Sequence, residues 1–488
     1  MNCLMRLLVT PLLLSTGVVS AQPSWDEGES FDDFREEWNA WAESLPAAHR
    51  MQPDLRDAVE RFDDDRDIEL SEELSEYPIF VFSDARPWGQ DWEHINSVRE
   101  AYQKDLDRLL GVVRRPYLGA PIPTFDDDGR SGLGLPSDWV TAHSLDSVSP
   151  LRKASIYLRA DAVYLAFNGE QEKAFDRFRL LDHLRQSTLE LPGKIQCLVE
   201  FAMRAMQEET MVELVKYDPD LFNDTQLAEM QSIMQGHLAA DYGHVFAFQQ
   251  LLTHEDWRLQ FHSMEFARTN AELRNLYHLA AKTYTDGYFG ELLPMVMKPE
   301  LDTDVSLATL KRQISVQSRI FDAMMIDLAA DPAIQRMPEI NTAMVKHLSG
   351  RDASRFVPVI VDTGLWRSHL GLMHRYDYQT TNHIVVLSIY RHRALHGAWP
   401  TSLAEIDPKV LPIPAIDYYS GDPLRYTLIN GEPRLWALGT DRDDDGGRPV
   451  PREEDASNLG WNWFALDEWK ALSDDQRAKY DGDLRILN

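Results

Sequence analysis

The sequence predicts a mainly α-helical protein that carries a small α+β module near its C-terminal end. Apolar residues recur at helical spacing from about residue 151 to residue 331, and strand signals are scarce there. One pair, Asn430 and Gly431, lies between two alternating apolar runs, which is the strongest short signal for a β-hairpin. The chain has two cysteines, and Cys3 lies in a segment that we expect to be cleaved off. The remaining Cys197 cannot form an internal disulfide, so a hydrophobic core must hold the fold.

Residues 1–21 have the pattern of a secretory signal peptide. Arg6 precedes the apolar stretch 7–19, and Val19, Ser20 and Ala21 fit a small-residue cleavage site. The stretch is too short to span a bilayer, and no later segment offers about 18 unbroken apolar residues. We therefore expect a chain without an integral membrane segment after cleavage, located in the periplasm or outside the cell.

Residues 22–145 form a predicted N-terminal region of helices and loops. Phe34, Trp38, Trp41 and Leu45 recur at roughly helical spacing, which predicts an amphipathic helix. A second helix is expected over residues 92–113. Residues 115–137 are rich in Pro, Gly and Asp, a composition typical of a loop.

Residues 146–375 form the predicted helical domain. Leu151, Ala154 and Leu158 lie on one helical stripe, Asn168 and Gly169 interrupt it, and a second stripe follows. This helix, turn, helix unit is similar to a tetratricopeptide hairpin. No 34-residue period is sustained, so we do not predict a repeat array. Another helix is expected over residues 224–251.

Residues 376–450 form the predicted α+β module, and residues 451–488 a helical tail. A helix over residues 382–396 should end at Gly397, where glycine is the common stop. The hairpin follows, with strands over residues 424–429 and 434–438. In the tail, a helix is expected over residues 461–480.

The charge balance bears on possible partners. The chain has 49 Lys and Arg against 79 Asp and Glu, a formal net charge of −30. Nucleic acid binding requires a basic footprint, so this composition argues against nucleic acid and against anionic lipid surfaces. It suits cation binding or high solubility.

An acidic loop follows the predicted hairpin. Asp441, Asp443, Asp445 and Gly446 give the spacing Asp-x-Asp-x-Asp-Gly, which places hard oxygen ligands together in a tight turn and predicts Ca²⁺ binding. An EF-hand would have Glu at the twelfth position, where this chain has Arg452. Two alternatives remain, an isolated calcium loop and a solvated acidic turn.

The module resembles a known family. The sequence from Gly397 through Trp399 and Pro400 to the Gly-Asp-Pro-Leu-Arg-Tyr run ending at Tyr426 resembles the C-terminal part of the type II secretion major pseudopilin, over about residues 380–447. The resemblance implies a small sheet with a calcium loop. It assigns the ligands to Asp441, Asp443 and Asp445, with Asp417 and Asp422 as weaker candidates.

The resemblance has limits that bear on function. The pseudopilin N-terminus is missing, so pilus assembly is not implied. The whole chain is more similar to a group of large exported bacterial proteins that place this module behind a helical domain. That second resemblance implies an architecture and no activity.

Histidines mark a different candidate site. His237, Asp241 and His244 are spaced to share one helix face, and His254 follows soon after. Imidazoles and a carboxylate so arranged could bind zinc or iron or perform acid–base chemistry. Ordinary surface and core histidines are the alternative. Weaker candidates of the same kind are His369, His374 and His383.

Two hypotheses follow from these patterns. The first is a non-enzymatic envelope or periplasmic interaction protein with a protein partner and a structural calcium loop. The alternative is a metal-dependent hydrolase whose site lies in the helical domain. The sequence sets no oligomeric state.

Overall fold

The structure is a computed structural model, and part of the chain is described. The described residues are 31–52, 54–61, 99–100, 102–122, 136–190, 193–240, 357–417, 420–438, 444, 446 and 484–487. These residues are mainly helical with one small antiparallel sheet, which confirms the predicted fold class at this level.

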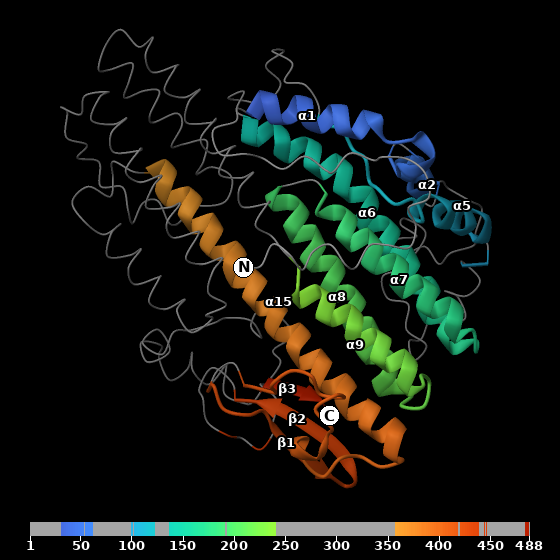
Figure 1. Ribbon diagram of the computed structural model, residues 1–488, viewed down its shortest axis with the longest axis vertical. Helices are drawn as coiled ribbons and strands as arrows, with labels where there is room; N and C mark the ends of the chain where they lie inside the picture. Colours follow the sequence, from blue (N-terminus) through green and yellow to red (C-terminus); the bar gives the residue numbers. More distant parts are fainter. Residues whose placement is uncertain are drawn as a thin grey trace, which may run out of the picture.

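The helices form one body, with the sheet at one side of its longest helix (Figure 1). The helices are α1 (Phe31–Ser44), α2 (Asp54–Glu60), α5 (Gln103–Val113), α6 (Pro136–Phe167), α7 (Gln171–Thr188), α8 (Lys194–Tyr217), α9 (Asp224–Leu238) and α15 (Val357–His396), with short 3-10 turns at Ala47–His49 and Leu403–Glu405. Helix α8 contacts α6 and α7 on one side and α15 on another, and α9 also lies against α15. Segments far apart in the sequence therefore meet around α8.

The predicted N-terminal helix is present as α1. Phe34, Trp38, Trp41 and Leu45 are all buried, and the Trp38 indole donates to the carbonyl of Ala120 at 3.0 Å. The helical stripe that the sequence predicted is thus the face that α1 turns to the core.

The helix, turn, helix unit around Gly169 is also present, as α6 and α7. Gly169 has a φ of +77°, a conformation that glycine adopts without steric cost. The amide of Glu170 donates to the carbonyl of Leu165 at 2.9 Å and that of Gly169 to Ala166 at 3.3 Å, which is the Schellman arrangement of a helix end. The tetratricopeptide-like classification remains a prediction.

Helix α9 begins at a capping box. Gln226 donates its amide to the side chain of Asn223 at 3.0 Å, and the Gln226 side chain accepts from the Asn223 amide at 3.1 Å. The helix ends at Leu238, and the remainder of the predicted range 224–251 lies outside the described residues beyond residue 240.

Helix α15 begins earlier than predicted but ends where expected. It spans 40 residues, whereas the sequence analysis predicted residues 382–396. The amide of Gly397 donates to the carbonyl of Arg393 at 2.7 Å, and Gly397 has a φ of +72°. Ile384, Val385 and Leu387 are fully buried on different sides of the helix, so this part of α15 lies inside the protein.

The hairpin prediction is confirmed. Strands β1 (Arg425–Ile429) and β2 (Glu432–Ala437) pair antiparallel, with Arg425 opposite Trp436 and Ile429 opposite Glu432. Asn430 and Gly431 form the turn with φ of +56° and +86°, as a two-residue primed turn requires.

The end of the described chain differs from the prediction. Leu484–Leu487 form strand β3, which pairs antiparallel with β2 and makes β2 the central strand. The prediction of a helical tail through residue 488 was wrong at these positions, because an available sheet edge decides the conformation of so short an apolar run. The helix predicted over residues 461–480 lies outside the described residues.

Two other predictions concern membranes and the lone cysteine. The predicted signal peptide lies outside the described residues. None of the described helices combines the length and the apolar character that crossing a membrane requires. Cys197 is a buried free thiol, and burial raises its pKa.

Candidate functional site

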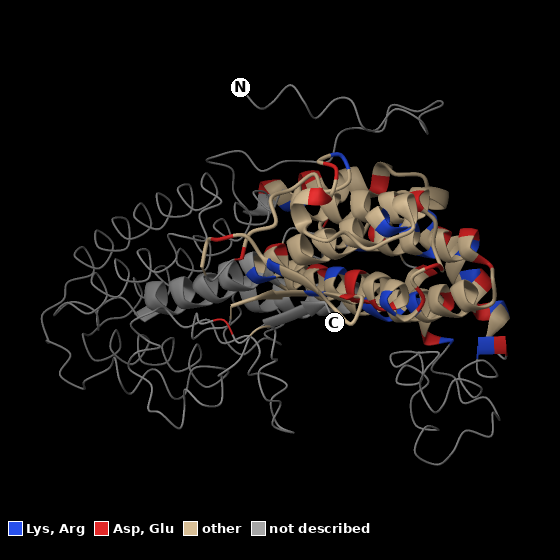
Figure 2. Ribbon diagram, turned by 90° about the horizontal axis from the view of Figure 1, so that it is seen from below, with Lys and Arg blue, Asp and Glu red and all other residues tan. Residues whose placement is uncertain are grey.

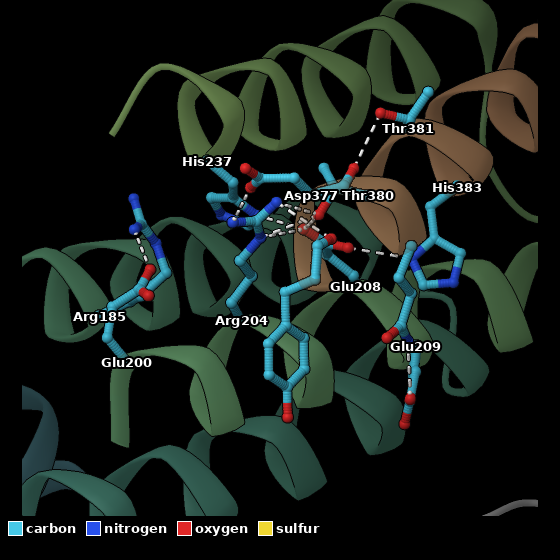
Figure 3. A network of polar contacts seen from close by, with 12 residues as sticks. Arg185, Glu200, Arg204, Glu208, Glu209, His237, Asp377, Thr380, Thr381 and His383 are labelled. Carbon is cyan, nitrogen blue, oxygen red and sulfur yellow. Dashed lines mark hydrogen bonds and ion pairs between the residues drawn. The ribbon is translucent and has the colours of Figure 1, made fainter. Parts of the chain in front are cut away.

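The densest cluster of ionisable and polar side chains is buried where α7, α8, α9 and α15 meet (Figure 3). We call it the Glu208 network. Its members are Asp182, Arg185, Glu200, Arg204, Glu208, His237, Asp377, Thr380 and His383.

Helical spacing brings these side chains together. Arg204 and Glu208 are four residues apart on α8, so they lie on one face. Asp377, Thr380 and His383 follow at three-residue steps on α15 and point to the same side.

The Glu208 carboxylate is the centre of the network. Its Oε1 accepts from His237 Nδ1 at 2.7 Å and from Thr380 Oγ1 at 2.6 Å, and its Oε2 lies 3.0 Å from His383 Nδ1. Figure 3 shows the two imidazoles approaching from opposite sides. Arg204 Nε adds a contact to Oε1 at 3.2 Å. Both carboxylate oxygens are therefore occupied by protein donors.

The electrostatic balance keeps Glu208 ionised. Burial by itself would raise the pKa of Glu208, because it penalises the charged form. Hydrogen bonds from His237 and His383 and the charge of Arg204 act in the opposite direction. Together they hold the pKa of Glu208 well below its usual range.

Arg204 connects the network to α15. The side chain is fully buried, and its guanidinium donates to Thr380 Oγ1, to Asp377 Oδ1 at 2.9 Å and to the Tyr376 carbonyl at 3.2 Å. Burial raises the pKa of Asp377, and the charge of Arg204 offsets part of that effect. One guanidinium thus fastens successive turns of α15 to α8.

His237 lies between two carboxylates. Its Nδ1 bonds to Glu208, and its Nε2 lies 3.3 Å from Asp182 Oδ1 without the alignment of a hydrogen bond. Burial would raise the pKa of Asp182, but the contact with His237 and the charge of Arg185 lower it overall. Arg185 also pairs with the buried Glu200.

This arrangement is chemically capable of more than packing. A carboxylate bonded to Nδ1 fixes the orientation and tautomer of an imidazole, which is how enzymes and metal sites prepare the other nitrogen. Within the described residues, however, no group of three or more His, Cys, Asp or Glu is placed to hold a metal ion.

The outcome for the predicted histidine site is mixed. His237 is in the network, whereas Asp241, His244 and His254 lie outside the described residues. His383, a weaker candidate, contacts Glu208 directly.

The sequence analysis missed Glu208 and Arg204. The sequence signal that could have identified them is the recurrence of polar residues along the otherwise apolar helix α8. Gln196, Glu200 and Gln207 of this helix are also buried.

The predicted calcium ligands are only partly described. Asp441, Asp443 and Asp445 lie outside the described residues. Asp417 is fully buried, and its Oδ2 accepts from the Leu438 amide at 2.9 Å and from Arg425 Nη1 at 3.2 Å. Asp422 is exposed, and its backbone carbonyl accepts from the Asp417 amide at 2.7 Å.

Asp444 is a described residue of the acidic loop, and its side chain contacts the sheet. Its Oδ1 accepts from Trp436 Nε1 at 3.0 Å and from the Gly446 amide at 3.0 Å. Its Oδ2 lies 3.8 Å from Arg425 Nε. Arg425 therefore stands between the carboxylates of Asp417 and Asp444.

The helical body carries charged residues of both signs and has a groove that is separate from the Glu208 network. Acidic and basic residues are interspersed along the ribbon of the helical body (Figure 2). An open groove of about 510 Å³ lies at the α6–α7 and α8–α9 turns, and residues such as Glu170, Lys173 and Asp220 line it. No residue of the Glu208 network lines this groove.

Comparison with known proteins adds no assignment. No family model, curated protein or solved structure matches this chain.

Proposed function

We propose that this chain is an exported, non-enzymatic interaction protein of the cell envelope, whose helical body supports a C-terminal module with a structural calcium loop. The observation that carries the proposal is the closure of the Glu208 network. Donors from α8, α9 and α15 occupy both oxygens of its central carboxylate.

A closed network of this kind suits a mechanical role. Several of its hydrogen bonds join different helices, so they fix α15 and α9 against α8. Helix α15 leads into the α+β module, because the 3-10 turn Leu403–Glu405 and strand β1 follow its end at His396. The network therefore supports a body that presents the module in one orientation.

The calcium part rests on the acidic loop. Asp444, which lies in sequence between Asp443 and Asp445, approaches Arg425 and bonds to Trp436, and Arg425 also pairs with Asp417. Calcium bound there would add a second cation to a place already rich in carboxylates. Ca²⁺ takes six to eight oxygen ligands, which three aspartates and water supply.

Thermal unfolding tests the calcium loop. We expect millimolar Ca²⁺ to raise the melting temperature relative to chelator, because an ion that binds only the folded state stabilises it. Asp443→Asn should abolish the shift, and Asp107→Asn, on the exposed side of α5, should preserve it. An equal melting temperature in Ca²⁺ and in chelator would refute the structural calcium loop.

The interaction part needs a separate measurement. Cross-linking in the envelope fraction, followed by co-purification, should recover a protein partner in a calcium-dependent manner. Loss of recovery in Asp443→Asn, with Asp107→Asn unchanged, would support the proposal. Recovery of the chain alone under all conditions would contradict it.

A metal-dependent hydrolase is the second candidate, because His237 and His383 converge on one carboxylate. In this case Asp241, His244 or His254 would supply the remaining ligands. Metal analysis of the purified protein separates the two candidates. Stoichiometric zinc or iron that is lost in His237→Ala, together with hydrolytic activity, favours the hydrolase, whereas calcium alone favours the interaction protein.

A further inference from the structure

A second pair of histidines lies at the C-terminal end of α15. His392 and His396 are four residues apart, and their ring centroids are 4.4 Å apart with an angle of 47° between the planes. His392 is only 6% exposed, whereas His396 is exposed. Two imidazoles at this spacing on one helix face can bind one metal ion together, as the histidines of helical zinc motifs do.

The ring nitrogens of this pair are uncommitted. His183 uses Nε2 on the Arg115 carbonyl at 2.7 Å, and His237 and His383 use Nδ1 on Glu208. In the part of the chain that the structure describes, no hydrogen bond involves an imidazole nitrogen of His392 or His396. The exposed His396 imidazole can therefore take up an ion from solvent, with the His392 ring beside it.

A carboxylate lies near this pair of histidines. Glu405 lies close enough to act electrostatically on both imidazoles. Its Oε2 accepts from the amide of Thr401 at 2.6 Å and from its hydroxyl at 2.9 Å, which holds the carboxylate in place. The C-terminal dipole of a helix adds further negative potential.

We propose that His392 and His396 form a binding site for a divalent transition-metal ion of the zinc class, with Glu405 as the nearby negative charge and water completing the coordination. Imidazole suits Zn²⁺, Ni²⁺ and Cu²⁺, whereas Ca²⁺ prefers oxygen ligands. The site is a two-residue chelate, and so it differs from an enclosed structural metal centre with four protein ligands. Neither histidine belongs to the Glu208 network, whose imidazoles are those of His237 and His383.

Zn²⁺ titration calorimetry of the purified chain in millimolar Ca²⁺ tests the site. Excess calcium fills the proposed acidic loop, so the titration reports nitrogen sites. We expect His396→Ala to lose one equivalent of bound Zn²⁺ relative to the wild type. His49→Ala removes another exposed histidine and should leave the stoichiometry unchanged. An unchanged stoichiometry and affinity in His396→Ala overturns the proposal.

A spectroscopic measurement guards against an effect of misfolding. The electron paramagnetic resonance spectrum of one equivalent of Cu²⁺ should show hyperfine coupling to two imidazole nitrogens, reduced to one in His396→Ala and in His392→Gln. Glu405→Gln should keep both nitrogens and weaken binding about tenfold. A two-nitrogen spectrum that persists in folded His396→Ala, judged by circular dichroism, places the copper elsewhere and refutes the site.

Discussion

Two buried carboxylates in this molecule, Glu208 and Asp417, both pair with an arginine, but the two pairs do different work. Arg204, the partner of Glu208, is fully buried, whereas the side chain of Arg425, the partner of Asp417, is 23% exposed. A buried guanidinium must find protein acceptors for its other donors. Arg204 finds them on α15, including Asp377, which is 173 positions away in the sequence.

The pair in the sheet module acts over a short range. Arg425 contacts Asp417, eight positions away, donates to the carbonyl of Pro423 at 3.2 Å, and has its Nε 3.8 Å from Asp444 Oδ2. The buried Arg204 thus joins helices that are distant in the sequence, whereas the partly exposed Arg425 joins residues that are close in the sequence.

The largest effect is expected from the same substitution at the two arginines. Arg204→Met leaves Glu208 and Asp377 without their buried cation, so the free energy of unfolding should fall by about 3–5 kcal/mol. Arg425→Met should lower the free energy of unfolding by about 1 kcal/mol, because water can take the place of the removed guanidinium beside Asp417. Urea unfolding followed by circular dichroism measures both.

Arg179→Met is the surface control, because Arg179 pairs with Glu229 and their side chains are 51% and 35% exposed. Its cost should not exceed that of Arg425→Met. Equal losses for Arg204→Met and Arg425→Met would show that burial of the arginine does not distinguish the pairs.

A partly buried carboxylate, Glu190, makes a third case that depends on pH. It accepts from the amides of Leu118 and Gly119, at 2.9 Å and 3.2 Å to Oε2, and burial raises its pKa to about 7. The folded protein therefore holds a proton that the unfolded chain releases near pH 4.5. Stability from this group is present below about pH 4.5 and is lost as pH rises through 7.

The measurement is the free energy of unfolding at pH 5 and pH 8. Glu190→Gln keeps an acceptor oxygen and removes the titration, so its loss between the two pH values should be smaller than that of the wild type by on the order of 3 kcal/mol. Parallel pH profiles for the two proteins would contradict the raised pKa.

The smallest effect is expected in the hairpin turn. Gly431 has a φ of +86°, so Gly431→Ala should lower stability by about 1 kcal/mol. Gly111→Ala, inside α5 and with open space around the added methyl group, should instead raise stability by up to about 1 kcal/mol. Thermal unfolding of both variants checks the opposite signs.

The features predicted well from the sequence are those that local chemistry decides. Asn430 and Gly431 specify a turn by their own conformational preferences, and Gly397 ends α15 for the same reason. The apolar stripe from Phe34 to Leu45 also needed no partner to be recognised. In these cases the signal and the structure lie within a few residues.

The features missed depend on distant contacts. Arg204 and Glu208 are ordinary helix-forming residues, and only the approach of α15 turns them into a buried network. His237 was named for its neighbours in sequence, yet its partner in the described structure is Glu208, on another helix. The spacing of apolar residues predicts which face of a helix is buried. It does not predict which polar residues will be buried together with that face.

Strand β3 gives the module an order of assembly. The β1–β2 hairpin closes over two residues and can form within microseconds, but β2 and β3 are separated by residues 438–483. Closing that interval costs chain entropy before any hydrogen bond compensates for it. During synthesis, β2 therefore presents an unpaired edge until residues 484–487 arrive. In this interval the free edge of β2 can pair with a strand of another chain. The module is therefore prone to aggregation until β3 pairs with β2.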